Sequence, residues 1–274
     1  MLFRSAITRT PCNDGAYQDQ PADTGCVLSP AGKYVNKANP IEATQCKAGT
    51  YQPRIGQSVC VNAAQGTYVD KPGATTTTPC KAGTYQPKAG QTTCIDTPPG
   101  SITADDGMET PEPCSAGTYA KEKASTECTP ASAGYFVADV GAIAQVKCNV
   151  GTYQPDTGKS ACIPAPAGKY VDKSGATDPT PCKAGTYQPD TGKTTCLDAR
   201  IGHVAPTEGL ANDVPCPKGS SYDKTGGTSC TAAPAGMFVG EAGTMVAQFC
   251  KDGTYTRSEE HTSELQSRFG ISYA

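Results

Sequence analysis

The sequence has no tryptophan, only 5 phenylalanines and 2 histidines among its 274 residues. With so few bulky apolar side chains, the chain cannot bury one large hydrophobic core. No apolar run approaches the roughly 20 residues of a membrane-spanning helix. The formal net charge is −3, so the chain offers no basic field to attract nucleic acid or an anionic membrane. Something other than a large core must therefore hold the chain together.

What the sequence has in quantity is glycine, proline and cysteine, with 30, 23 and 15 residues. The spacing of the cysteines alternates between a shorter step, as from Cys12 to Cys26, and a longer one, as from Cys26 to Cys46, without exception up to Cys250. This spacing defines a 34-residue repeat, in which the octapeptide CKAGTYQP recurs at 46–53, 80–87 and 182–189. Tetratricopeptide repeats have the same length, but stretches such as GTYQPDTG and PTPC would break their helices.

A finer period divides each repeat into two half-repeats of equal length. A first glycine stands at every seventeenth position from Gly15 to Gly253, and Tyr or Phe follows two residues later in most copies. A second glycine comes seven residues after the first in 11 of 14 copies. The exceptions are Ala22, Asn39 and Ala124.

The residues of a half-repeat predict one small β-hairpin. In 185–196, the segment GTYQP reads as extended, PDTGK as a turn, and KTTC as a second extended segment. We expect the second glycine to adopt positive φ, which Asn39 tolerates best among the substitutes. The first glycine is expected to let the neighbouring half-repeat approach closely, with each unit touching only its neighbours.

Every second half-repeat lacks both cysteines together, as at Ala63 and Thr77, so we interpret the two positions as partners. The rival phase, which begins with Cys26–Cys46, leaves Cys12 unpaired, and sequence alone does not fix the connectivity. A closed loop of about 15 residues stabilises by about 3 kcal/mol, and regular disulfides indicate an oxidising compartment. The favoured phase leaves Cys250 unpaired by truncation. It predicts Cys12–Cys26, Cys46–Cys60, Cys80–Cys94, Cys114–Cys128, Cys148–Cys162, Cys182–Cys196 and Cys216–Cys230.

The two ends of the chain differ from the repeats. Residues 2–5, LFRS, and 257–267, RSEEHTSELQS, resemble translated sequencing adapters. The glycine and cysteine periods also fail there, because Glu260 and Glu264 occupy the next positions. We therefore predict that 1–5 and 257–274 are adapter artefact, and that 6–256 is a fragment of a larger protein built from tandem cysteine-rich repeats.

The pattern C-x2-G-T-Y-x8-C, followed by a unit without cysteine such as PAGKYV at 166–171, resembles the ephrin-receptor-like cysteine-rich repeats of GCC2/GCC3 type, relatives of the tumour necrosis factor receptor modules. The resemblance covers about residues 12–256, without the second cysteine pair of the fuller pattern. It implies small disulfide-linked β-modules in a large extracellular or cell-surface protein, and carries over no ligand-binding residues. The expected fold is small, disulfide-rich and all-β, an elongated tandem array of short β-hairpin modules.

Side chains that could carry chemistry are few. His203 lies at a position that varies among half-repeats, which favours an exposed residue over a catalytic one. Cysteine–histidine clusters with zinc-ligand spacing are missing, and Asp105 and Asp106 lack an EF-hand loop. Without phosphate-binding or nucleophile motifs, we expect no catalytic site, metal or cofactor. The run TTTT at 75–78 could carry O-linked sugar, although a polar strand end is the favoured interpretation.

A chain that repeats its scaffold and varies at exposed positions is most simply building length. The first hypothesis is a non-catalytic structural or spacer segment of a large extracellular or cell-surface protein, such as a stalk, filament or adhesin. Its expected partners are the neighbouring repeats of the same larger protein, and any membrane anchor lies outside the fragment. The alternative is a receptor-like ectodomain that binds a protein or glycan ligand, for which GYF at 134–136 and GMF at 236–238 are the hints. An enzyme would need a further domain.

Overall fold

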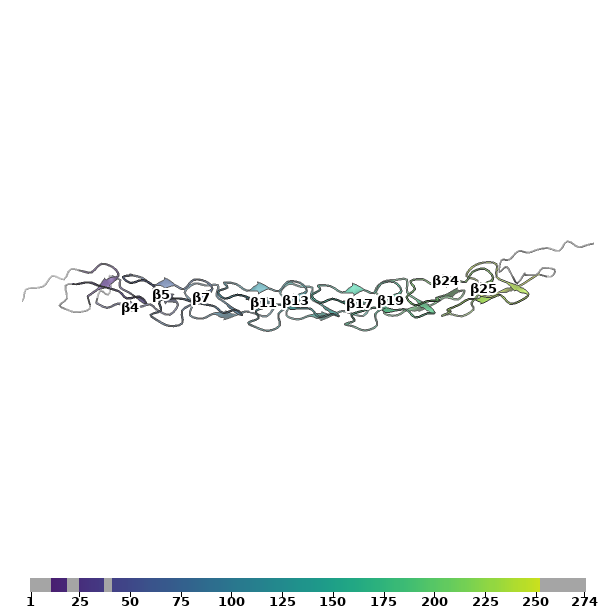
Figure 1. Ribbon diagram of the computed structural model, residues 1–274, viewed down its shortest axis with the longest axis horizontal. Coiled ribbons are helices and arrows are strands. Elements are labelled where there is room, and N and C mark those ends of the chain that lie inside the picture. The colour runs from purple at the N-terminus through teal and green to yellow at the C-terminus, as the bar shows by residue number, and fades with distance from the viewer. Residues whose placement is uncertain (1–10, 19–24, 37–40, 252–274) are drawn as a thin grey trace, which may run out of the picture. The chain divides into compact units, whose positions relative to one another are not determined.

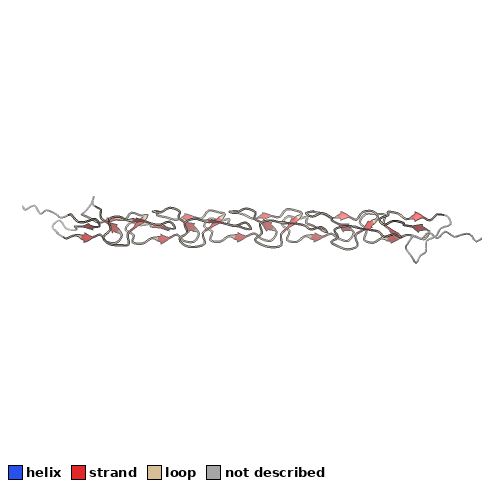
Figure 2. Cartoon of the chain, turned by 90° about the horizontal axis from the view of Figure 1, so that it is seen from above, coloured by secondary structure: helices blue, strands red, loops and turns tan. Residues whose placement is uncertain are grey.

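The computed structural model describes residues 11–18, 25–36 and 41–251. In these ranges the backbone consists of short strands, turns and loops, with no helix (Figure 2). The chain divides into two compact units, Met1–Pro130 with Asp139–Ala144, and Ala131–Ala138 with Gln145–Ala274. The small, disulfide-rich all-β fold predicted from the sequence is confirmed.

Several expectations fall on other parts of the chain. The adapter-like stretches 1–5 and 257–274 lie outside the described residues, as do Ala22 and Asn39 at the second-glycine position. The assignment of 6–256 as the natural repeat region therefore stays a prediction.

Each half-repeat in the described ranges forms one antiparallel hairpin, and each hairpin is a separate two-stranded sheet. The first strands of two successive hairpins of the first unit, β5 and β7, are labelled in Figure 1. The hairpins of the first unit are β1 (Ala16–Tyr17) with β2 (Val27–Leu28), β3 (Lys33–Tyr34) with β4 (Thr44–Gln45), β5 (Thr50–Tyr51) with β6 (Val61–Asn62), β7 (Thr67–Tyr68) with β8 (Thr78–Pro79), β9 (Thr84–Tyr85) with β10 (Ile95–Asp96), β11 (Ser101–Ile102) with β12 (Glu112–Pro113), and β13 (Thr118–Tyr119) with β14 (Thr129–Pro130). Those of the second unit are β15 (Tyr135–Phe136) with β16 (Val146–Lys147), β17 (Thr152–Tyr153) with β18 (Ile163–Pro164), β19 (Lys169–Tyr170) with β20 (Thr180–Pro181), β21 (Thr186–Tyr187) with β22 (Leu197–Asp198), β23 (His203–Val204) with β24 (Val214–Pro215), β25 (Ser220–Ser221) with β26 (Thr231–Ala232), and β27 (Met237–Phe238) with β28 (Gln248–Phe249).

The first strand of a hairpin begins directly after the first glycine. In the half-repeat of Gly185, Tyr187 lies opposite Leu197. The N–H of Ala199 donates to the carbonyl of Gly185 at 2.9 Å and ends the pairing. Since each strand has two residues, such a hairpin would be marginal in isolation and needs its neighbours.

The second strand does not lie where the sequence predicted. Residues 193–196 form part of the loop before β22, so their assignment as the second extended segment is wrong. The carbonyl of Thr195 accepts a hydrogen bond from the side chain of Gln188 at 2.8 Å. That carbonyl is therefore used inside the loop, and strand pairing starts only after Cys196.

Backbone hydrogen bonds join each hairpin to the half-repeats that follow. The N–H of Gly49 donates to the carbonyl of Val69, in the next half-repeat, at 2.8 Å. The N–H of Gly90, the second glycine of a later hairpin, donates back to the carbonyl of Ala63 at 2.8 Å. The same links recur along both units, so the array is held largely by backbone groups that do not depend on side-chain identity.

The first glycine also contacts the half-repeat after next. A Cβ on Gly49, where φ is +87°, would lie 2.3 Å from the carbonyl oxygen of Gly90. No side chain fits at that distance, so the close approach requires glycine. The first glycine does permit a close backbone approach, as expected, but the approaching backbone belongs to the half-repeat after next and not to the neighbouring one. The expectation that each unit touches only its immediate neighbours is therefore wrong.

The second glycine adopts positive φ, as expected, because the loop turns sharply there. The φ of Gly90 is +73°. Ala124 keeps the same conformation with a φ of 57°, although a left-handed conformation is unfavourable for a residue with a Cβ. The half-repeat that contains Ala124 is therefore strained where the other described half-repeats, which have glycine, are not.

The buried side chains come mainly from two positions in each half-repeat, three residues before and three residues after the first glycine. At the earlier position the exposed fraction is 0–1% for Ser29, Cys46, Ala63, Cys80, Thr97, Cys114, Ala131, Cys148, Ala165, Cys182, Ala199 and Cys216. At the later position it is 0–3% for Val35, Gln52, Val69, Gln86, Thr103, Ala120, Val137, Gln154, Val171, Gln188, Ala205 and Val239. All but the glutamines are small or β-branched, which fits a narrow core between hairpins.

Seven disulfides join cysteines that are 14 residues apart. In every bond after the first, the earlier cysteine is buried and the later one is half-exposed. Cys250 forms no disulfide within the described residues. The bonds are Cys12–Cys26, Cys46–Cys60, Cys80–Cys94, Cys114–Cys128, Cys148–Cys162, Cys182–Cys196 and Cys216–Cys230.

Replacing Gly49 by alanine should destabilise the protein by about 3 kcal/mol or more, because the new Cβ would overlap the Gly90 carbonyl. Gly107→Ala is the matched control, since its φ is +81° but the nearest atom to its Cβ would be 3.8 Å away. The control should cost about 1–2 kcal/mol, for the left-handed conformation alone. Urea unfolding followed by tyrosine fluorescence measures both, and equal losses would contradict the contact.

Candidate functional site

The residues considered for catalysis and metal binding do not form a site. His203 lies half-buried in β23, where its Nδ1 is 3.3 Å from the carbonyl oxygen of Ile201. Across the residues that the structure describes, no three His, Cys, Asp or Glu side chains come together as a metal-ligand set. The expected absence of a catalytic site and of a cofactor stays a prediction.

Asp106, considered for calcium, bridges two half-repeats instead. One carboxylate oxygen lies 2.8 Å from Nζ of Lys81, and the other accepts the N–H of Ala82 at 2.9 Å. The hydrogen bond from Lys81, and then that from Ala82, lower the pKa of Asp106 below its ordinary value. Because one oxygen is engaged in an exposed ion pair and the other in a backbone hydrogen bond, this carboxylate acts as a surface link.

A buried glutamine closes the loop in four of the disulfide-bonded hairpins. In the hairpin of Cys80–Cys94, the side-chain N–H of Gln86 donates to the carbonyl of Thr93 at 2.7 Å. Its Oε1 accepts the N–H of Lys88 at 3.2 Å. We call this arrangement the glutamine clasp, and it recurs at Gln52, Gln154 and Gln188.

The clasp ties the start of the loop to the residue directly before the second cysteine. It therefore runs beside the disulfide and fixes the same loop without depending on it. Sequence analysis missed this role, although Gln is the seventh residue of the octapeptide CKAGTYQP and accompanies the cysteine each time. Half-repeats without cysteine mostly have Val at this position, as at Val69 and Val171.

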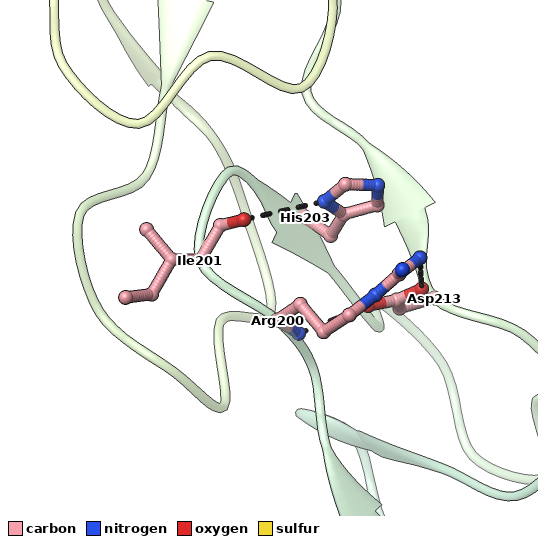
Figure 3. Close-up of polar contacts among 4 residues, drawn as sticks. All are labelled: Arg200, Ile201, His203 and Asp213. Atoms are coloured by element: carbon pink, nitrogen blue, oxygen red, sulfur yellow. Dashed lines mark hydrogen bonds and ion pairs between the residues drawn. The ribbon is translucent and has the colours of Figure 1, made fainter.

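An ion pair occupies the disulfide position of one half-repeat that lacks cysteine. Asp213 stands eleven residues after Gly202, where disulfide-bonded half-repeats have their second cysteine. Its carboxylate accepts hydrogen bonds from Nε and Nη2 of Arg200 at 3.0 and 2.8 Å, and from the Arg200 backbone N–H at 2.9 Å. Figure 3 shows the guanidinium facing this carboxylate, with the His203 ring turned toward the Ile201 carbonyl.

Burial makes the Arg200–Asp213 pair different from the other ion pairs. The Asp213 side chain is 1% exposed, whereas both members of the Lys159–Asp156 pair are at least half exposed. The hydrogen bond from the Arg200 guanidinium holds the pKa of Asp213 below its ordinary value, against the opposing effect of burial. A charged carboxylate is thus the stable form at this position.

Another half-repeat without cysteine uses a neutral group in the same place. Oε1 of Gln145 accepts the N–H of Ser132 at 2.6 Å. Ser132 and Arg200 occupy equivalent positions, two residues before the first glycine. In cysteine-free half-repeats, the backbone N–H two residues before the first glycine can therefore be bonded by a carboxylate, as at Asp213, or by an amide oxygen, as at Gln145.

The surface carries exposed aliphatic side chains and the aromatic ring of Phe249 in β28, which is 78% exposed, whereas the aromatic stretches that hinted at a receptor are half-buried. Tyr135–Phe136 and Met237–Phe238 are half-buried strands, and Nζ of Lys147 lies 5.9 Å from the centre of the Tyr135 ring. Thr75, Thr76 and Thr78 are exposed. Exposed aliphatic residues lie in loops, as at Ile55, Val140 and Val246, with exposed fractions of 61–63%. They also lie on second strands, with exposed fractions of 40–55%, at Val27, Leu28, Val61, Ile95, Val146, Ile163, Leu197 and Val214.

Residues 32–78, 66–110 and 134–182 match the family described as tyrosine-protein kinase ephrin type A/B receptor-like. The repeats in these stretches are ephrin-receptor-like, as the resemblance predicted. A search of curated proteins finds no match to the chain. Within 11–18, 25–36 and 41–251, no helix is long and apolar enough to cross a membrane. Together with the disulfides, the match identifies a cysteine-rich module of extracellular type.

Asp213→Asn should destabilise the protein by about 1–3 kcal/mol at neutral pH, because it weakens charge-assisted hydrogen bonds to a buried group. Asp156→Asn, in the exposed pair with Lys159, should change stability by less than about 0.5 kcal/mol. Thermal unfolding of both variants checks the difference.

The same pair predicts an acid dependence. Since the folded-state pKa of Asp213 is lowered, its contribution is complete above the unfolded pKa of about 3.9 and disappears as pH falls through the folded value. The stability gap between the wild type and Asp213→Asn should therefore be constant near neutrality and close below about pH 4. A gap unchanged at acidic pH would show that the carboxylate charge contributes nothing.

Proposed function

We propose that residues 6–256 are a non-catalytic spacer segment of an extracellular or cell-surface protein, as in a stalk, filament or adhesin. The observation that carries the proposal is the recurrence of one set of backbone links along both units, as at Gly49, Gly66 and Gly151. Each link joins a half-repeat to one that follows it, so an added half-repeat lengthens the array rather than widening it. Neighbouring repeats of the same larger protein are its partners.

The glycine contacts and the disulfides support this function. A spacer must keep the domains at its two ends a fixed distance apart. This requires that successive modules resist bending. The first glycines bring backbones together too closely for intervening side chains, as at Gly49 and Gly90. Disulfides inside the hairpins limit unfolding of single modules outside the cell, where reductants are scarce.

Small-angle scattering of oxidised recombinant 6–256 tests the proposal. A compact domain of this length would have a radius of gyration of about 18 Å. We expect a value at least about twice as large, with the profile of a rod, because the links add modules in series. A radius near that of the compact domain would overturn the spacer. Reduction and alkylation should replace the rod profile by that of a flexible chain.

A receptor-like ectodomain is the second candidate, favoured by one observation in the first unit. Three disulfide-bonded hairpins each place a half-buried tyrosine opposite an exposed aliphatic residue. The pairs are Tyr17 with Val27, Tyr51 with Val61, and Tyr85 with Ile95. Binding to a panel of extracellular proteins and glycans, lost in the double variant Val61→Lys and Ile95→Lys but kept in Thr44→Lys and Thr78→Lys, would support it.

A further inference from the structure

We propose that, among the first-unit loops that the structure describes in full, the loop closed by Cys114–Cys128 is the most easily reduced, so that a dithiol opens the array there before it opens the clasped hairpins. The inference does not depend on the spacer function. It rests on what holds each loop besides its disulfide.

In the clasped hairpins the second cysteine stays in place even when its disulfide is broken. Gln86 bonds the carbonyl of Thr93, directly before Cys94, and the N–H of Lys88 near the start of the loop. Two thiols held beside each other have a high effective concentration, which favours the disulfide over the separated thiols. The clasp therefore makes the disulfide harder to reduce.

The Cys114–Cys128 hairpin has no such support. The position of the clasp glutamine, three residues after the first glycine, is occupied here by Ala120. Ala120 is 2% exposed and has no side-chain hydrogen-bonding group. The same loop contains Ala124 at a φ of 57°, where the other described hairpins have glycine. Opening this loop releases a strained residue, whereas opening a clasped loop breaks two partly buried hydrogen bonds.

The other described loop without glutamine is filled differently. In the hairpin of Cys216–Cys230 the clasp position is Tyr222, and its ring packs over Gly227. A Cβ on Gly227 would lie 2.6 Å from a ring carbon, so the two residues fit closely. Aromatic packing thus takes the place of the clasp there, while Ala120 has neither.

Opening this loop would also loosen the preceding hairpins. The N–H of Ala124 donates to the carbonyl of Thr97 at 2.9 Å, and the carbonyl of Ser125 accepts the N–H of Thr103 at 3.2 Å. The Ala124 carbonyl oxygen also lies against Gly83, 2.5 Å from where a Cβ would be. A local reduction would therefore remove contacts to two earlier half-repeats.

The chemistry is ordinary thiol–disulfide exchange. A thiolate of the dithiol attacks Sγ of Cys128, which is half-exposed, while Cys114 is 1% exposed. The S–S bond breaks, and its electron pair goes to Sγ of Cys114, which takes a proton. The second thiol of the reagent then displaces Cys128 as a thiol and leaves the dithiol oxidised to its cyclic disulfide.

Native-state reduction of the full chain tests the proposal. The protein is equilibrated in graded ratios of dithiothreitol to its oxidised form, quenched by alkylation and mapped by peptide mass spectrometry. Cys114 and Cys128 should be half-alkylated at a ratio about tenfold lower than Cys80 and Cys94, since the clasp adds two hydrogen bonds. The two disulfides are matched controls, because both have a buried first and a half-exposed second cysteine.

Two variants separate the clasp from other causes. Ala120→Gln should raise the ratio for Cys114–Cys128 toward that of Cys80–Cys94, with the strain at Ala124 left in place, and Gln86→Ala should lower the ratio for Cys80–Cys94 by about tenfold. Non-reducing peptide maps confirm that each variant keeps its oxidised pairing. Reduction of Cys114–Cys128 together with or after the clasped disulfides would overturn the proposal, as would variants that leave both ratios unmoved.

Discussion

The contact on which the array depends is the approach of a backbone carbonyl to a first glycine, as between Gly90 and Gly49. It lets hairpins of two-residue strands pack without bulky side chains. Once backbones meet this closely, the space left between them admits only small or β-branched residues, and glutamine where its amide can bond the loop. The close backbone packing thus requires a sequence with few large apolar residues. The disulfides and the side-chain hydrogen bonds supply the stability that a large hydrophobic core would otherwise provide.

The two buried positions of a half-repeat are filled by several combinations of side chains. A cysteine at the first accompanies a glutamine at the second in the clasped hairpins, and alanine accompanies valine in Ala63 and Val69. In the half-repeat of Thr97 and Thr103, the two buried hydroxyl groups lie 2.6 Å apart and hydrogen-bond to each other. The Thr97 hydroxyl also donates a hydrogen bond to the carbonyl of Gly83. Each combination leaves no buried side-chain nitrogen or oxygen without a partner among the described residues.

Much of this architecture follows from local signals in the sequence. The regular period of the first glycine predicts one hairpin per half-repeat, and the second glycine predicts the positive φ, because both are properties of a short segment. The position of the second strand was missed because the strand has only two residues and lies beyond the cysteine position, at the same register in β22 and in β8, whose half-repeat has no glutamine at the clasp position. Contact with the half-repeat after next joins residues far apart in sequence, and no local pattern reports it. The Arg200–Asp213 pair occurs once among the described half-repeats, so no repetition pointed to it.

The alternation of disulfide-bonded and cysteine-free hairpins has a consequence for how such a chain can change in length during evolution. Deleting a single half-repeat would bring two hairpins of one kind together and change which buried residues face each other. Deleting or duplicating a whole repeat, with one hairpin of each kind, would restore every link, because hairpins of the same kind are interchangeable at the backbone. Unequal recombination between near-identical copies such as 46–53, 80–87 and 182–189 produces changes of whole repeats. Gene length can therefore vary in steps that each leave a foldable protein.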